Sequence, residues 1–271
     1  MKLKNILALT TAAVGFAALA AQAQTTSEWE GNAYARYTTS YVFRGDKKAG
    51  QSMEGNIEFK PVATKDGFFV GAWINQPFAS ERNFEFDLYG GYRYNVSERI
   101  VVDAGLTGFF YPQSSGGITS YSYEFNVSAS YMLMKNWGVT ASVYYDVRLQ
   151  ALTAELSTGY RIPYKLTSKW IGSLDFSAFA GNSGVKNYFP DANLAAKRKD
   201  NYSYYGATVS TTVFFNPNWS VSVGIQYGDT INKAWTPVTA IDRHGTAVKV
   251  GGYGKDTSDN LYGYVSVGIR W

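Results

Sequence analysis

The sequence predicts an all-β protein, a transmembrane up-and-down antiparallel β-barrel of about twelve strands. Three features indicate this fold. Apolar and polar residues alternate along about a dozen segments, as in strands with one apolar face and one wet face. The composition is rich in residues typical of barrels, with 22 tyrosines, 16 phenylalanines and 27 glycines. The 7 prolines fall between the segments, where a missing backbone N–H breaks no ladder.

The last eleven residues show the alternation most clearly. One face carries Leu261, Gly263, Val265, Val267, Ile269 and Trp271, and the other carries Tyr262, Tyr264, Ser266, Gly268 and Arg270. A strand that ends on an aromatic residue in this way resembles the C-terminal strand of bacterial outer-membrane barrels. The resemblance implies that Trp271 is part of the signal read by the barrel-assembly machinery. The last strand of a soluble β-sandwich shows the same alternation, so this segment alone leaves both folds open.

The first 23 residues have the features of a secretory signal peptide, which leaves residues 24–271 for the barrel. Lys2 and Lys4 precede an apolar run over 6–20, and Ala21 and Ala23 are the small residues of a cleavage site. We therefore expect an exported protein. Without the two lysines the formal net charge falls from +4 to +2, so the charge gives no indication of nucleic-acid binding. The chain has no cysteine, and stability must come from burial or sheet closure.

The first strands differ in regularity. The strand expected over 31–44 carries charges on one face only, at Arg36 and Arg44, and a turn over 45–50 joins it to a second strand over 53–60. The third, over 68–76, is the least regular, because it is apolar on both faces up to Ile74. Alternation returns in the fourth, over 84–94. The remaining strands are expected over 100–111, 121–133, 137–149, 152–162, 170–181, 204–215, 219–228 and 261–271.

Connection lengths and aromatic placement favour a membrane barrel over a sandwich. Connections near 134, 165 and 217 are short, whereas those over 182–203 and 229–258 are long and lie at the opposite end, as expected of periplasmic turns and outer loops. The strand ends at the short turns carry Trp137, Trp170, Trp219 and Trp271. The opposite ends carry Tyr41, Phe43, Phe84, Phe110, Tyr121, Tyr205 and Tyr227. Two aromatic girdles at the two membrane interfaces are therefore expected.

Two motifs resemble a known family. They are Tyr41-Val-Phe-Arg-Gly45, expected at the top of the first strand, and Glu85-Phe-Asp-Leu-Tyr-Gly-Gly-Tyr92 on the fourth. Both are similar to the signature of the TorF-type porins, an uncharacterised proteobacterial family of outer-membrane β-barrels. The strand rhythm matches over the mature chain, while the motifs cover only its first third. The resemblance implies an outer-membrane barrel in a Gram-negative bacterium with a role in transport.

The wet faces of the strands collect charges of both signs. The set is Arg36, Arg44, Glu54, Glu58, Lys60, Glu85, Asp87, Arg93, Asp103, Glu124, Asp146, Arg148, Glu155, Arg161, Asp175 and Arg270. In an open barrel these side chains line a pore, and the near balance of charge predicts weak ion selectivity. In a closed barrel they pair across the lumen as a plug. The first alternative predicts passive diffusion of small hydrophilic solutes, and the second a non-conducting structural or adhesive barrel that presents long loops.

Arg44 is singled out because it is expected to face inward at the outer mouth, next to Gly45. One interpretation pairs it with Glu54 across the first hairpin. The other makes it an anion contact in the entrance, because guanidinium groups bind carboxylates readily.

We expect no enzyme, cofactor or metal site. The only histidine is His244, which lies in the last long loop without a spaced serine motif. No cluster with metal-ligand spacing is visible. The basic segment Lys197-Arg-Lys199 could contact the phosphates of lipopolysaccharide at the outer leaflet, or it could be a solvated loop. The expected partners are thus outer-membrane lipid, lipopolysaccharide, the assembly machinery and small hydrophilic solutes, with no nucleic acid.

The resemblance of the last strand leads to a test of Trp271. Deleting this residue, or replacing it with lysine, should lower the amount of assembled protein in the outer membrane, because the assembly signal is lost. Secretion to the periplasm should be little affected. Fractionation and immunoblotting of both compartments measure this, and undiminished insertion would show that Trp271 is not part of such a signal.

Overall fold

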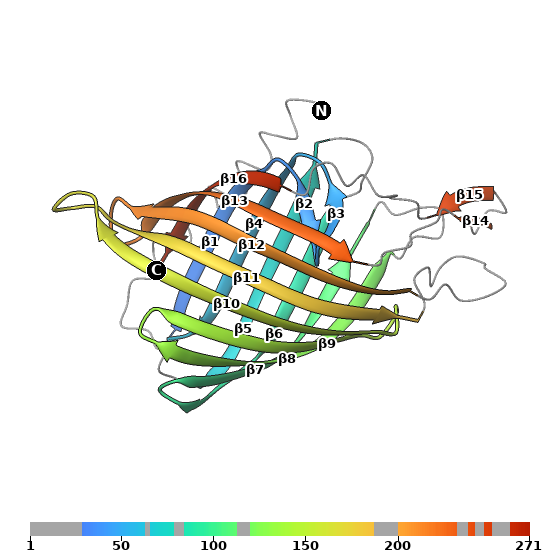
Figure 1. Cartoon of the computed structure of the whole chain (residues 1–271), viewed down its shortest axis with the longest axis horizontal. Helices are drawn as coiled ribbons and strands as arrows, with labels where there is room; N and C mark the ends of the chain where they lie inside the picture. Colours follow the sequence, from blue (N-terminus) through green and yellow to red (C-terminus); the bar gives the residue numbers. More distant parts are fainter. Residues whose placement is uncertain are drawn as a thin grey trace.

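The structure, a computed structural model, describes residues 29–62, 66–78, 84–112, 120–186, 200–231, 238–241, 247–250 and 261–271. Twelve antiparallel strands close into a barrel, as predicted, because β1 pairs with both β16 and β4 (Figure 1). The wall strands are β1 (Trp29–Thr38), β4 (Ser52–Pro61), β5 (Gly67–Pro77), β6 (Glu85–Ser97), β7 (Ile100–Phe110), β8 (Tyr121–Met134), β9 (Trp137–Asp146), β10 (Ala151–Lys165), β11 (Ile171–Val185), β12 (Asp200–Phe214), β13 (Trp219–Ile231) and β16 (Leu261–Arg270). No helix in this described part of the chain is long and apolar enough to cross a membrane.

The two ends of the barrel differ in their connections. We call the end with the connections 62–66, 98–99, 135–136, 166–170 and 215–218 the turn end, and the opposite end the loop end. The connections at the loop end are longer, except for the turn over 147–150. The two long loops are shorter than predicted, because β11 extends to Val185, β12 begins at Asp200 and β13 extends to Ile231. Within the second loop, β14 (Val238–Ile241) and β15 (Ala247–Val250) pair and project beyond the barrel (Figure 1).

The prediction that every proline lies between strands is wrong at three positions. Pro61 and Pro77 are the last residues of β4 and β5, and Pro163 lies inside β10, paired with Ser173 of β11. On the other side of β10, pairing with β9 ends at Tyr160, and Arg161 donates its N–H to the carbonyl of Asn136 in the turn. The ring nitrogen of Pro163 therefore points where no strand lies, so its missing N–H costs no ladder bond. Pro190 and Pro237 lie outside the described residues.

The outer face of the barrel is apolar and the inner face is polar. Outward side chains such as Phe125, Leu156 and Ile225 are each more than half exposed. Their strand neighbours, such as Glu124 and Ser157, point the other way because side chains alternate along a strand. An apolar exterior around a polar interior is the arrangement that a membrane barrel requires.

The aromatic girdles are only partly as predicted. All four tryptophans named above lie at the turn end, where Trp271 packs edge-on against Phe59. At the loop end the rings of Tyr205 and Tyr227 lie side by side. Tyr41 and Phe43 do not belong to this girdle, because their segment leaves the wall and enters the lumen.

Closure of the sheet leads to a gel test. The folded protein in SDS at room temperature should migrate differently from the boiled protein, because a closed ladder offers no free edge at which unfolding can start. Electrophoresis of heated and unheated samples, with urea-unfolded protein as the reference, measures the shift. Identical migration of all three samples would argue against a closed barrel.

Candidate functional site

The strand predicted over 31–44 is in fact two elements. β1 ends at Thr38, whose hydroxyl donates to the carbonyl of Ser40 at 2.7 Å. β2 (Tyr41–Phe43) and β3 (Asp46–Ala49) then form a separate hairpin, and the wall resumes at Ser52, the register partner of Thr38. Residues 39–51 therefore leave the wall and return to it at the same level. We call β2 and β3 with their turn the lumen hairpin.

The tip of the lumen hairpin is a two-residue turn that lies against β12 and β13. Arg44 and Gly45 both have positive φ, 50° and 72°, as in the tight turns that join two-residue hairpins. Gly45 lies against the carbonyl of Asp229 and the side chain of Tyr204, so closely that no Cβ would fit. β12 and β13, which supply these contacts, lie across β16 from β1. A glycine is needed at this position for its conformation and for the close approach.

Arg44 joins the hairpin tip to β8 on the far side of the barrel. Its Nη1 and Nη2 donate to Oε2 and Oε1 of Glu124 at 2.8 and 2.9 Å. The two side chains are only 13% and 6% exposed, and the guanidinium also stacks over the ring of Tyr144 at 4.5 Å. Burial alone lowers the pKa of Arg44, but the Glu124 carboxylate outweighs it and raises the pKa above its ordinary value.

This contact corrects the interpretation in which Arg44 pairs with Glu54. Glu54 faces Arg36 of β1 instead, with an N–O distance of 3.6 Å. Arg44 is separated from Glu54 because the hairpin carries it across the lumen. Its guanidinium is engaged by a protein carboxylate, so the anion-contact interpretation requires an anion to compete with Glu124.

Aromatic side chains hold the flanks of the lumen hairpin. The ring of Tyr41 lies 5.4 Å from that of Trp73 on β5, and the ring of Phe43 lies 6.3 Å from that of Phe109 on β7. The contact with Tyr41 accounts for Trp73 on the inner face of the strand predicted over 68–76, which is apolar on both faces. The other large inward ring of that strand, Phe69, lies over Gly91 and Gly105 of β6 and β7.

An acidic row lies beside the hairpin on β4, β5 and β6. The register places Asn75 between Glu54 and Glu85, and Asp87 follows Glu85 on the same face of β6. We call Glu54, Asn75, Glu85 and Asp87 the acidic row. All four are buried, and Glu85 accepts a hydrogen bond from the hydroxyl of Tyr111 at 2.8 Å.

The other predicted residues of the loop end have defined contacts. Asp146 accepts hydrogen bonds from the hydroxyl of Ser122 and from the backbone N–H of Arg148, so it caps the turn after β9. Glu155 accepts from the hydroxyl of Tyr204 at 2.9 Å. Arg148 stacks over the ring of Tyr121 at 3.9 Å and therefore lies at the rim.

In the half of the lumen nearer the turn end, the predicted charges are paired. Arg93 and Asp103 form a bidentate pair at 2.8 and 2.9 Å, and Arg161 contacts Asp175 at 2.5 Å. Glu58 pairs with Lys60 at 3.2 Å and accepts from the hydroxyl of Tyr89. The Arg161 side chain is 67% exposed because it lies at the rim of the turn end, past the last pair of β10 and β9. The inward side chains of Arg93 and Asp103 are 24% and 21% exposed, so water also reaches the pair inside the wall.

Several residues that shape the site were missed from the sequence. They are Trp73, Asn75, Phe109, Tyr144 and Tyr204, all inward and all in or beside the contacts of the hairpin. The sequence did contain a signal: large aromatic rings occur at positions that the alternation along the strand assigns to the inner, polar face. Such a ring lies either over a glycine of a neighbouring wall strand, as Tyr89 does over Gly71, or against a segment inside the lumen, as Trp73 does against Tyr41.

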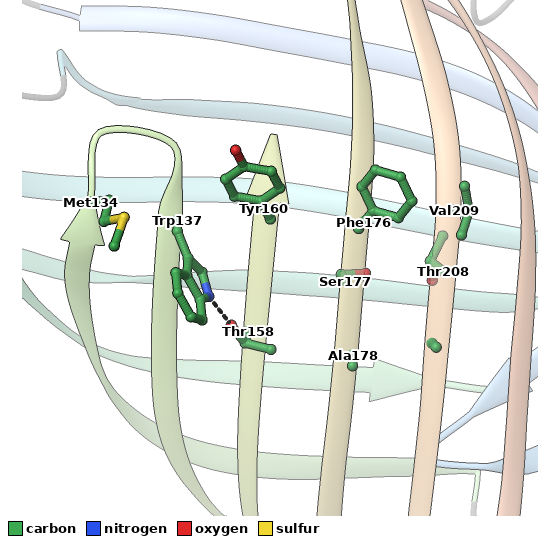
Figure 2. A pocket seen from close by; sticks show the side chains of 10 residues that line it. Met134, Trp137, Thr158, Tyr160, Phe176, Ser177, Ala178, Thr208 and Val209 are labelled. Carbon is green, nitrogen blue, oxygen red and sulfur yellow. Dashed lines mark hydrogen bonds between the residues drawn. The ribbon is translucent and has the colours of Figure 1, made fainter. Parts of the chain in front are cut away.

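A groove on the outer face of the barrel is separate from the lumen. It has a volume of about 600 Å³ and lies near the turn end, over β8 to β12, lined by Met134, Trp137, Tyr160, Phe176 and Val209 (Figure 2). Its polar contact is within the wall, where the indole N–H of Trp137 donates to Thr158 at 2.8 Å (Figure 2). These side chains belong to the outward, apolar face, so the groove is not part of the lumen.

The remaining predictions concern metals and loops. Among the described residues, no group of three or more acidic, histidine or cysteine side chains is placed to hold a metal ion. His244 and the segment 197–199 lie outside the described residues. The predictions about them, and the absence of an enzyme activity, stay predictions.

The Arg44–Glu124 pair leads to a test of hairpin docking. Arg44→Ala should expose Lys47 and Lys48 of β3 to trypsin, because losing one partner of a buried pair costs about 3 to 5 kcal/mol. Mass spectrometry of the digest detects cleavage after these lysines. Arg161→Ala, which removes a solvent-exposed pair in the other half of the lumen, is the matched control. Equal cleavage of both variants would contradict the role of Arg44 as an anchor.

Among the solved structures with a similar fold are two porins and an outer membrane channel. The KdgM porin is similar with a TM-score of 0.50 at 10% identity, over 88% of this chain and 98% of that chain. The NanC porin has a TM-score of 0.47 at 10% identity, over 88% and 98% of the two chains. The COG4313 outer membrane channel from Pseudomonas putida F1 has 0.46 at 9% identity, over 92% and 97%. At this identity the likeness to the KdgM porin shows the fold alone.

The sequence comparisons give a family. No curated protein matches this chain in sequence. A family model described as "Bacterial protein of unknown function (Gcw_chp)" matches residues 22–251. Its description names no porin type, so the resemblance to TorF-type porins stays a prediction. Because the family model covers most of the chain, the protein belongs to the Gcw_chp family of bacterial proteins.

Proposed function

We propose that the protein is an outer-membrane channel of a Gram-negative bacterium that passes small hydrophilic solutes by diffusion, with a bore narrowed by its own lumen hairpin. The observation that carries the proposal is the contrast between the two halves of the lumen. Toward the turn end the lumen is lined by paired charges and hydroxyl groups and is open to water. Toward the loop end the hairpin crosses it.

The polar lining supports a path for solutes. On β8 to β13 the inward positions near the turn end are mostly small and hydroxylated, such as Ser130, Thr140 and Ser222. Such groups can exchange hydrogen bonds with water or a solute without presenting a strong fixed charge. The charged pairs are concentrated on β6, β7, β10 and β11.

Ion selectivity is set by the charges at the narrowest level rather than by the sum over the wet face. The inward side chains include nearly equal numbers of acidic and basic groups. This supports weak ion selectivity, as expected from the sequence, in the half of the lumen near the turn end. At the level of the hairpin the Arg44 charge is taken up by Glu124, and the buried carboxylates of the acidic row lie at the same level. Any preference of the channel should therefore arise at the hairpin.

The hairpin also supports the second candidate function. A non-conducting barrel that presents its loops to an external partner would need a closed lumen, and a hairpin in contact with six wall strands would serve that purpose. The two candidates differ in one measurable property, which is conductance.

Removing the hairpin tests the proposal. Replacing residues 39–51 with a short Gly-Asn turn keeps the wall intact, because Thr38 and Ser52 are register partners. In planar bilayers we expect small conductance steps from the native barrel and steps several-fold larger from the shortened one, because the bore is no longer crossed. The gel shift on heating verifies that the variant is folded.

The two functions give opposite results. A native barrel that never conducts, while the shortened barrel does, would assign the protein to the non-conducting class. Equal conductance of both would show that the hairpin does not limit the bore.

A further inference from the structure

We propose that the acidic row beside the lumen hairpin is a binding site for an organic cation, a solute that carries an ammonium or guanidinium group. The inference rests on the proposed channel function and adds the class of solute for which the channel is selective. It is independent of the paired charges near the turn end.

The geometry of the acidic row gathers carboxylates around one amide. Glu54 and Glu85 are the register partners of Asn75 on its two sides, and neighbouring strands lie ~4.8 Å apart. Asp87 stands opposite Trp73, two residues from Glu85 on the same face. Three acids and an amide oxygen thus face one region of the lumen from three adjacent strands.

The two arginines that the structure describes near the row are engaged elsewhere than at Asp87. Arg36 lies 3.6 Å from Glu54, and Arg44 is bound by Glu124 on β8. Interactions between charges are stronger in a buried site than in water, so an incoming cation is attracted and an anion is repelled.

A second observation points to a ligand independently of the charge. Asn75 is 1% exposed, yet neither its Oδ1 nor its Nδ2 has a hydrogen-bond partner among the described residues. Oδ1 of Asp87 is likewise buried without a partner. Buried polar groups are normally hydrogen-bonded, and exceptions call for a specific explanation. The N–H groups of a cation can donate to both oxygens, and the Asn75 amide can donate to an oxygen atom of the same solute.

The aromatic neighbours favour an organic cation over a hydrated metal ion. Trp73 lies beside Asn75 on the inner face of β5, and Tyr41 of the hairpin packs on it at 5.4 Å. A cation with a carbon skeleton gains contact with the rings as well as the attraction of their faces for positive charge. Because Tyr41 belongs to the hairpin, the hairpin forms one side of the site.

The test uses the native barrel in planar bilayers with potassium chloride. Methylguanidinium added to one side should reduce the potassium chloride current in a saturable manner, whereas its neutral analogue methylurea should not. Asp87→Asn should weaken the block at least several-fold. Asp175→Asn, which changes a lumen carboxylate near the turn end, is the matched control and should leave the block unchanged. Asn75→Asp adds a carboxylate to the row and should strengthen the block.

The outcomes separate this inference from the channel proposal. If the barrel conducts but methylguanidinium and methylurea act alike, or Asp87→Asn and Asp175→Asn have the same effect, the cation site is refuted and the channel stands. If magnesium chloride at matched ionic strength blocks the current equally, the block depends on positive charge alone, and the organic-cation site is also refuted.

If the barrel does not conduct, calorimetric titration of the liposome-reconstituted protein with methylguanidinium decides. Saturable binding that Asp87→Asn weakens supports the site, and the absence of binding overturns it.

Discussion

Closure of the sheet is the constraint on which the rest of the structure depends. β1 pairs with β16 on one side and with β4 on the other, so each wall strand has two neighbours. In hydrocarbon an unpaired edge would leave backbone groups without hydrogen bonds, and closure removes this cost. Closure also fixes which side chains face lipid and which face the lumen, because a shift of one residue would exchange the two faces. The polar groups inside must then find partners within the lumen.

The lumen hairpin supplies many of those partners. Its turn holds Arg44 at positive φ, which costs of order 1 kcal/mol for a residue other than glycine, and the bidentate contact with Glu124 offsets that cost. The two motifs that resemble the TorF-type signature meet here. The motif 41–45 forms β2 and the turn, and the motif 85–92 contributes Glu85 and Asp87 to the acidic row. Both motifs thus supply residues at the level of the lumen hairpin.

Most of the wall could be predicted from the sequence, and the inside of the lumen could not. Alternation located the twelve strands to within a few residues, because a strand with one face in lipid must alternate. The same alternation of apolar and polar residues continues past Thr38 to Phe43, so the sequence pattern does not mark the point where the chain leaves the wall. The partner of Arg44 lies 80 residues away on a strand that is not its neighbour, and no local pattern specifies such a contact. The apolar inner face of β5 was the visible sign, because Trp73 packs against Tyr41 inside the barrel.

The central claim is that residues 39–51 cross the lumen rather than extend the wall. Because the chain has no cysteine, two introduced cysteines can report on this placement directly. A short bifunctional maleimide should cross-link Phe43→Cys to Phe109→Cys, whose rings face each other inside the barrel. It should not link Phe43→Cys to Phe110→Cys, the adjacent residue that points outward. Cross-linking of the second pair but not the first would contradict the account.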